Sequence, residues 1–208
     1  MLLLQREDIE RVFSMKDAIE ADKEAFALAS AQKAVMPLRT TLSATDGTFL
    51  FMPSYAEELK YGALKTVNVF PGNGEKDIPV TQGLITLMDG ETGVFAAVLD
   101  GTYVTALRTG ASAGAVFDLF ARKDASVGAL IGTGGQAQAQ LEAMICNRNL
   151  KEVRVFSRRE EKRIAFAKRM NDLYGSDSLR ITPATSADEA VTGADVITAA
   201  TTSTTPGI

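Results

Sequence analysis

The chain has 208 residues, of which 46% are hydrophobic and 23% charged, and its net charge is −4. This composition is typical of a globular protein, and the slight acidity argues against a nucleic acid or an anionic membrane as partner. No apolar run reaches the roughly 18 residues of a membrane span. We therefore expect a cytoplasmic protein that acts on small molecules.

Two residue types restrict the possible chemistry. The sequence contains no histidine and a single cysteine, Cys146. Histidine-based catalytic triads and histidine-ligated zinc are therefore excluded within these residues, and no metal site is expected. Nothing beside Cys146 in the sequence would lower its pKa, so we expect it to pack in the core on a helix. Any chemistry must depend on carboxylates, lysine, arginine, tyrosine or a cofactor.

The first half of the chain predicts α+β structure. Residues 14–17 resemble a capping box, and helical spacing of apolar residues continues to about residue 31. Short strand-like runs between residues 38 and 99 are separated by turn sequences, which favours a mainly antiparallel sheet. Residues 102–121 are again helical, and their small residues at 109–115 would allow close packing. We place the domain boundary at 122, giving domains 1–122 and 123–208.

The second half predicts a parallel α/β sheet. Strands are expected near 126–131, 152–156, 179–182 and 195–200, with helical stretches between them. A dinucleotide-binding fold with strand order 3-2-1-4-5-6 needs two strands more than these four. We therefore expect this domain to be incomplete at its C-terminus.

A glycine turn follows the first of these strands directly. Gly132, Gly134 and Ala137 have the G-x-G-x-x-A spacing of a dinucleotide-binding turn. The first glycine permits the tight turn, the second lets the backbone approach a pyrophosphate, and the small Ala137 lets the next helix pack closely. The flanking strand and helix favour a dinucleotide site over the alternative, a purely structural turn.

The three residues that directly follow the second predicted strand of this half indicate which coenzyme is preferred. Ser157, Arg158 and Arg159 occupy the region where an NAD-preferring site usually carries Asp or Glu. A hydroxyl and two guanidinium groups suit a ribose 2′-phosphate, so the sequence favours NADP over NAD. The alternative is that both arginines belong to a solvated helix start together with residues 160–163.

Three cations occur in apolar surroundings. Lys65 shares a predicted strand face with Val67 and Val69, Arg39 precedes a strand-like run, and Arg108 lies within a predicted helix. Together they could bind a substrate carboxylate, because arginine matches its geometry and lysine adds a point charge. The alternative is that each is a surface charge, with Lys65 extending to water.

Several motifs in this order resemble the ornithine cyclodeaminase/mu-crystallin family. They are Met-Pro-Leu-Arg at 36–39, Gly-Ala-Leu-Lys-Thr at 62–66, Thr-Gln-Gly at 81–83, Thr-Ala-Leu-Arg-Thr-Gly-Ala at 105–111, Gly-Thr-Gly-Gly-Gln-Ala at 132–137 and Ala-Asp-Val-Ile-Thr at 194–198. The resemblance covers nearly the whole chain. It implies a homodimer in which domain 1–122 provides the substrate site and the dimer sheet, joined to a Rossmann-type NAD(P)-binding domain, 123–208.

The resemblance also implies roles for individual residues. Arg39, Lys65 and Arg108 look like the residues that hold the substrate carboxylate, and Lys65 also looks catalytic, close to the reacting carbon. The implied coenzyme contacts are Thr81 and Arg108 at the nicotinamide, Gly135 and Gln136 at the pyrophosphate, Ser157 and Arg158 at the adenosine ribose, and Thr198 and Thr201 near the adenosine. The family's general acid/base, an aspartate, would lie beyond Ile208.

The activity implied is NAD(P)-dependent hydride transfer at the α-carbon of a small L-amino acid, through an imine. This includes cyclodeamination of ornithine to proline and ammonia, amino-acid dehydrogenation and ketimine reduction. A non-catalytic, NADPH-binding homodimer of the mu-crystallin type is the alternative. The sequence does not identify the residues that would recognise the substrate side chain, so the choice among these stays open.

Overall fold

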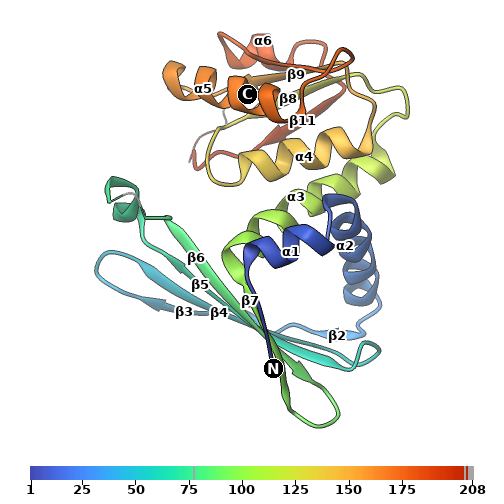
Figure 1. Ribbon diagram of the computed structural model, residues 1–208, viewed down its shortest axis with the longest axis vertical. Coiled ribbons are helices and arrows are strands. Elements are labelled where there is room, and N and C mark those ends of the chain that lie inside the picture. The colour runs from blue at the N-terminus through green and yellow to red at the C-terminus, as the bar shows by residue number, and fades with distance from the viewer. Residues whose placement is uncertain (77, 204, 206–208) are drawn as a thin grey trace. The chain divides into compact units, whose positions relative to one another are not determined.

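The computed structural model describes residues 1–76, 78–203 and 205 (Figure 1). Two compact units are present, one formed by Met1–Ser14 and Lys23–Thr105, the other by Met15–Asp22 and Ala106–Ile208. Helices α2 (Met15–Ser30) and α3 (Gly101–Phe120) each contribute residues to both units. The expected division into domains 1–122 and 123–208 stays a prediction.

The first unit is built on a seven-stranded sheet with the order β1-β7-β6-β5-β4-β2, in which β3 also pairs with β4. The strands are β1 (Leu2–Leu4), β2 (Ala34–Val35), β3 (Thr40–Ser43), β4 (Thr48–Ala56), β5 (Tyr61–Val69), β6 (Thr81–Asp89) and β7 (Phe95–Asp100). All pairings are antiparallel except that of β1 with β7, which is parallel. The mainly antiparallel sheet expected from the sequence is confirmed.

Turn chemistry and caps explain how this unit is connected. Between β6 and β7, the Asp89 carboxylate accepts the backbone N–H of Thr92 at 2.7 Å, and Gly93 has a φ of +72°, which favours glycine. Helix α1 (Arg6–Val12) starts where the Asp8 carboxylate accepts the Gln5 backbone N–H at 3.1 Å. A 3₁₀ helix, Pro71–Glu75, follows β5. Strands β1 and β2 and helix α1 were not predicted.

The second unit contains a four-stranded sheet in which all neighbouring strands are parallel, with the order β10-β9-β8-β11. Its elements are β8 (Val127–Ile131), α4 (Ala137–Asn147), β9 (Glu152–Phe156), α5 (Glu160–Tyr174), β10 (Arg180–Pro183), α6 (Ala187–Val191) and β11 (Val196–Ala199). Counted within this sheet, the order is 3-2-1-4, the Rossmann arrangement predicted from the sequence. The fold class is therefore α/β, as expected.

Helices cover both faces of this parallel sheet. Leu130 of β8 belongs to a cluster that includes Leu141 of α4 and Met170 of α5, all 0% exposed. Its neighbours Ala129 and Ile131 point to the opposite face, where they pack with residues of the α6 segment. Because both faces are buried, the strand reads as a continuous apolar run, as parallel strands commonly do.

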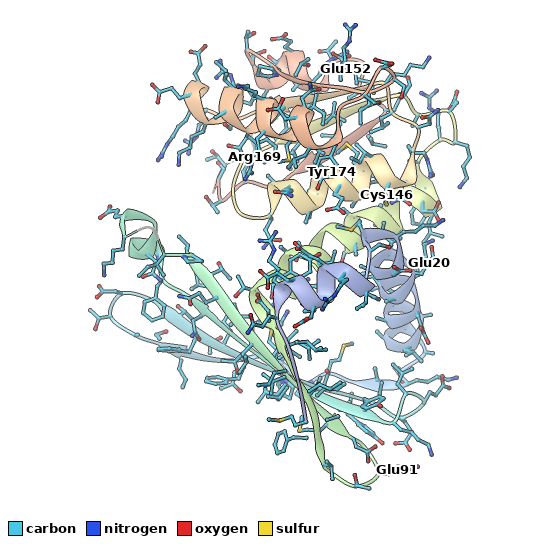
Figure 2. The ribbon with its side chains drawn as sticks, viewed as in Figure 1. Glu20, Glu91, Cys146, Glu152, Arg169 and Tyr174 are labelled. Carbon is cyan, nitrogen blue, oxygen red and sulfur yellow. The ribbon has the colours of Figure 1, made fainter. Side chains whose placement is uncertain are left out.

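The small residues of α3 allow the close packing that the sequence predicted. A Cβ added to Gly110 would lie 2.4 Å from the backbone oxygen of Ala139 in α4. A Cβ added to Gly114 would lie 2.5 Å from Cδ1 of Ile19 in α2. Cys146, near the end of α4 (Figure 2), is exposed. The expectation that Cys146 packs in the core is therefore wrong, because the buried face of α4 is formed by residues such as Leu141 and Met144.

Candidate functional site

The glycine turn lies at the carboxyl edge of the parallel sheet, between β8 and α4. Gly132 has a φ of +107°, a conformation that glycine adopts without the penalty paid by other residues. Its backbone N–H donates to the Phe156 oxygen at 2.7 Å, and an added Cβ would lie 2.6 Å from the oxygen of Ala200. Gly132 is therefore fixed between the ends of β9 and β11, and no larger residue fits.

The next two glycines leave open space above the turn. Gly134 and Gly135 are exposed, and a Cβ added to either would meet no heavy atom within 4 Å outside the adjacent residues. Ala137 is 0% exposed beneath them, and α4 begins there. The buried Oε1 of Gln136 has no hydrogen-bond partner among the described residues. An open helix start whose backbone amides point outward fits a dinucleotide pyrophosphate, whereas the Gln136 oxygen, an acceptor, would need a donor such as water or a coenzyme hydroxyl.

The turn from β9 to α5 lies beside the glycine turn. Thr133 Oγ1 donates to Ser157 Oγ at 3.1 Å, which joins the two turns directly. Arg158 and Arg159 are exposed, and Arg159 precedes the first residue of α5. Parallel strands end at the same edge of a sheet, and in open α/β sheets ligands bind in the crevice outside those ends. Ser157 is thus brought next to the glycine turn, as a ribose-recognising residue would be.

Thr198 and Thr201, the two threonines assigned near the adenosine, lie at different distances from the glycine turn. Thr201 follows β11, and its Cγ2 would lie 3.3 Å from a Cβ added to Gly132, so it borders the glycine turn. Thr198 instead lies inside β11, one residue before its end, and pairs with Leu130. Its buried Oγ1 has no hydrogen-bond partner among the described residues.

Lys65 lies on the face of the seven-stranded sheet that is buried in the first unit. It pairs with Met52 of β4 and Ile85 of β6, and the next residue on its face, Val67, is 4% exposed. Extending the register of β3 by one residue places Arg39 opposite Met52, about 10 Å from Lys65 at the usual strand spacing. Thr81, at the start of β6, pairs with Val69 and shares this face.

Arg108 is exposed on α3, in the part that belongs to the second unit. One turn further on, the Ser112 hydroxyl contacts both the Arg108 carbonyl oxygen, at 2.8 Å, and an Asp22 carboxylate oxygen, at 2.7 Å. Burial raises the pKa of Asp22, while Ser112 and the charge of Arg108 act in the opposite direction. The proximity of Arg108 to Lys65 and Arg39 stays a prediction.

Two residues near the glycine turn, at the carboxyl edge of the parallel sheet, were not predicted as functional. Thr133 lies between two glycines, and its hydrogen bond to Ser157 has no signal in the sequence. Arg163 was considered only as part of a solvated run, yet its side chain is 11% exposed.

The described residues contain no group of three or more histidine, cysteine, aspartate or glutamate side chains that could hold a metal ion. No helix in the described ranges is long and apolar enough to cross a membrane.

Comparison with known families gives one match over almost the whole chain. The model of the ornithine cyclodeaminase/mu-crystallin family matches residues 1–207. Among curated relatives, alanine dehydrogenase of Archaeoglobus fulgidus is 41% identical over 160 residues, which cover 77% of this chain and 49% of that protein.

Solved structures give the same picture. Thermococcus litoralis Δ1-pyrroline-2-carboxylate reductase, in complex with NADH and L-proline, has a TM-score of 0.93 and 37% identity, covering 100% of this chain and 64% of that one. An archaeal alanine dehydrogenase dimer with bound NAD has a TM-score of 0.77 and 38% identity over 86% of this chain and 56% of its own. A lysine cyclodeaminase has a TM-score of 0.82 and 29% identity over 100% of this chain and 63% of its own. The chain thus spans between 49% and 64% of the length of these proteins.

Proposed function

Because the chain belongs to the ornithine cyclodeaminase/mu-crystallin family, we propose that it binds NAD(P) and takes part in hydride transfer at the α-carbon of a small L-amino acid or its imine. The observation that carries this proposal is the glycine turn at the edge of the 3-2-1-4 parallel sheet, open above Gly134 and Gly135. The relatives support it, since two of the solved structures hold NADH or NAD.

In this proposal the second unit holds the coenzyme. Gly134, Gly135 and the start of α4 bind the pyrophosphate, with Gln136 and Ala137 shaping the turn. Ser157, Arg158 and Arg159 bind the adenosine ribose and favour NADP through a 2′-phosphate, whereas Thr198 and Thr201 are assigned near the adenosine. A bound nicotinamide coenzyme supplies a hydride donor or acceptor.

The first unit is proposed to hold the substrate. Lys65 and, if the register of β3 is extended by one residue, Arg39 lie on the same sheet face, where they would neutralise the substrate carboxylate, with Lys65 close to the reacting carbon. Lys65 is half-buried, which strengthens its attraction for a substrate carboxylate, because charges interact more strongly away from bulk water. Arg108 and Thr81 complete the proposed set, at the carboxylate and the nicotinamide.

Reduction of a cyclic imino acid is the reaction that we favour. The reductase from Thermococcus litoralis matches the whole chain, with a TM-score of 0.93, against 0.82 for the cyclodeaminase. Oxidation of NADPH or NADH on addition of Δ1-pyrroline-2-carboxylate tests this reaction. Consumption of ornithine without net coenzyme change would instead establish cyclodeamination, and tight coenzyme binding without turnover would establish a mu-crystallin-type binding protein.

Coenzyme binding is tested most directly by Gly134→Ala. An alanine side chain there meets no heavy atom of the chain within 4 Å, so it should leave the Tm unchanged. It would instead occupy the space assigned to the pyrophosphate, and the Kd for NADPH should rise by about tenfold or more. Gly72→Ala, equally unobstructed, is the matched control. An unchanged Kd in the Gly134 variant would refute the proposed cradle.

A homodimer through the sheet of the first unit is also proposed. The sheet face opposite Lys65 carries large apolar side chains that are exposed, among them Leu3 (69%), Leu42 (54%) and Leu84 (49%). Such a face on three different strands is typical of a surface that another protein covers, and a related alanine dehydrogenase is a dimer.

The dimer is tested by Leu84→Lys, which places a charge on that face. Sedimentation should show dissociation to monomers, whereas Leu173→Lys on α5, with 59% exposure, should leave the dimer intact. If the Leu84→Lys variant remains a dimer, the interface lies on another surface.

The single cysteine and the metabolic relatives favour a cytoplasmic location, which cell fractionation would test.

A further inference from the structure

Arg163 is unusually buried for its position on the molecule. It lies in the second turn of α5, a helix that starts with the charged residues Glu160 and Glu161. Its side chain is nevertheless only 11% exposed, against 71% for Glu160. An arginine that gives up most of its hydration needs compensating contacts.

Two of these contacts lie at the end of β9 and one on α5 itself. Nη1 of Arg163 donates to the backbone oxygen of Ser157 at 3.3 Å. The guanidinium carbon lies 5.7 Å from the centroid of the Phe156 ring, within range of a cation–π interaction. Nη2 is 3.6 Å from a carboxylate oxygen of Glu160, which is largely solvated and so offsets little of the charge. The side chain therefore folds back over the last residues of β9.

The segment that Arg163 holds is the one that contacts the glycine turn. Phe156 accepts the backbone N–H of Gly132 at 2.7 Å through its backbone oxygen, and Ser157 accepts from the Thr133 hydroxyl at 3.1 Å. Arg163 thus contacts the same two residues from the helix side. Its loss would free Ser157 to move relative to the turn.

We propose that Arg163 is a positioning residue that holds Ser157 against the glycine turn and, by its charge, raises the preference of the coenzyme site for a ribose 2′-phosphate. This inference rests on the proposed coenzyme-binding function. The residue after the second strand of such a fold recognises the ribose 2′ position, and a nearby arginine accommodates a phosphate there. Arg158 and Arg159 are exposed, whereas Arg163 is held in place, so its charge is preorganised beside Ser157 before any anion binds.

The test compares Arg163→Gln with the unaltered full chain. The chain contains no tryptophan, so binding is followed by the fluorescence of NADPH and NADH or by calorimetry. The Kd for NADPH should rise by about tenfold and the Kd for NADH by less than about threefold, which lowers the NADPH preference. Arg163→Lys, which keeps the charge and a donor, should fall between the two proteins.

Arg169→Gln is the matched control. Arg169 lies on the same helix (Figure 2), and its guanidinium carbon is 5.6 Å from the ring of Phe166, but the residue is exposed. Neither Kd should change in this variant. If Arg163→Gln raises both Kd values by the same factor or alters neither, or if the lysine variant is no better than the glutamine variant, the inference is wrong. If the unaltered protein binds neither coenzyme, the proposed function fails, and this inference fails with it.

Discussion

Replacing Arg148 by methionine should destabilise the second unit strongly. Arg148 directly follows α4, and its side chain is 4% exposed. Nη2 donates to the backbone oxygens of Phe117, Asp118 and Ala121 at 2.6, 3.1 and 2.9 Å, and Nε donates to that of Arg122 at 2.9 Å. One guanidinium group therefore contacts four carbonyls at and just after the end of α3, where the helical hydrogen bonds run out. The Phe117 oxygen also accepts the Ala121 backbone N–H at 3.1 Å, and the Asp118 oxygen also accepts from Lys123 Nζ at 3.3 Å.

The size of the effect follows from which of these carbonyls water can reach. Methionine keeps most of the apolar stem but donates no hydrogen bonds. Water can replace the donor at the half-buried Asp118 and Ala121 and at the exposed Arg122, whereas Phe117 is buried, with 9% exposure. A hydrogen bond from a charged donor contributes about 1.5–3 kcal/mol. The bond to the buried Phe117 oxygen, together with the Asp118 carboxylate that loses its contact with Nη1 at 3.4 Å, gives a loss of about 3 kcal/mol, a large part of a typical domain's stability.

Urea unfolding followed by circular dichroism measures this loss. With a typical slope of about 2 kcal/mol per molar urea, the midpoint should fall by about 1.5 M. Arg154→Met is the control, because Arg154 also donates to carbonyls, those of Glu189 and Thr192, but is 24% exposed. Its loss should be below about 1 kcal/mol. A similar small loss in Arg148→Met would refute the assignment of α3 stability to this side chain.

Three further substitutions test the site and the sheet. Gly132→Ala should destabilise the protein by about 2 kcal/mol or more and abolish measurable coenzyme binding, because φ is +107° and the oxygen of Ala200 would lie 2.6 Å from Cβ; an unchanged Tm would contradict this. The amides of Ser126 and Val127, with the Arg122 charge, lower the pKa of Asp195 to about 2 from its usual 3.8, so its contribution to stability is lost as pH falls from about 4 to 2. Asp195→Asn should remove that pH dependence from thermal unfolding, and an identical acid limb would refute it. Lys65→Met should lower kcat/KM by at least about a hundredfold with little change in coenzyme Kd, and unaltered kinetics would identify Lys65 as a structural charge.

The parts of the fold that the sequence predicted are those encoded locally. The strand before Gly132, the spacing of the glycines and the helix formers after them are all contiguous, so β8 and β9 lie within one residue of their expected bounds, and α4 forms between them as predicted. The sequence also predicted that Lys65 shares a strand face with Val67. Successive side chains of a strand point to opposite faces whatever covers those faces, so this prediction needed no knowledge of the packing.

Other features depend on residues far apart in the sequence. β1 is three residues long and pairs with β7, more than ninety residues away, so no local period could indicate it. Arg163 has the helical neighbours of a solvated residue, and its burial comes from packing back on Phe156. The exposure of Cys146 depends on which side of α4 meets the sheet, and its apolar neighbours along the chain led to the wrong prediction.

The segment Met15–Asp22 has a consequence for recombining this protein with its relatives. Ile19 is 1% exposed, and its Cδ1 would lie 2.5 Å from a Cβ at Gly114, so the second unit uses an isoleucine encoded some ninety residues upstream of the rest of it. A chimera with a single crossover near residue 105 would pair this isoleucine with a foreign α3. Two crossovers, exchanging 15–22 together with 106 onward, would keep the partners that were selected together.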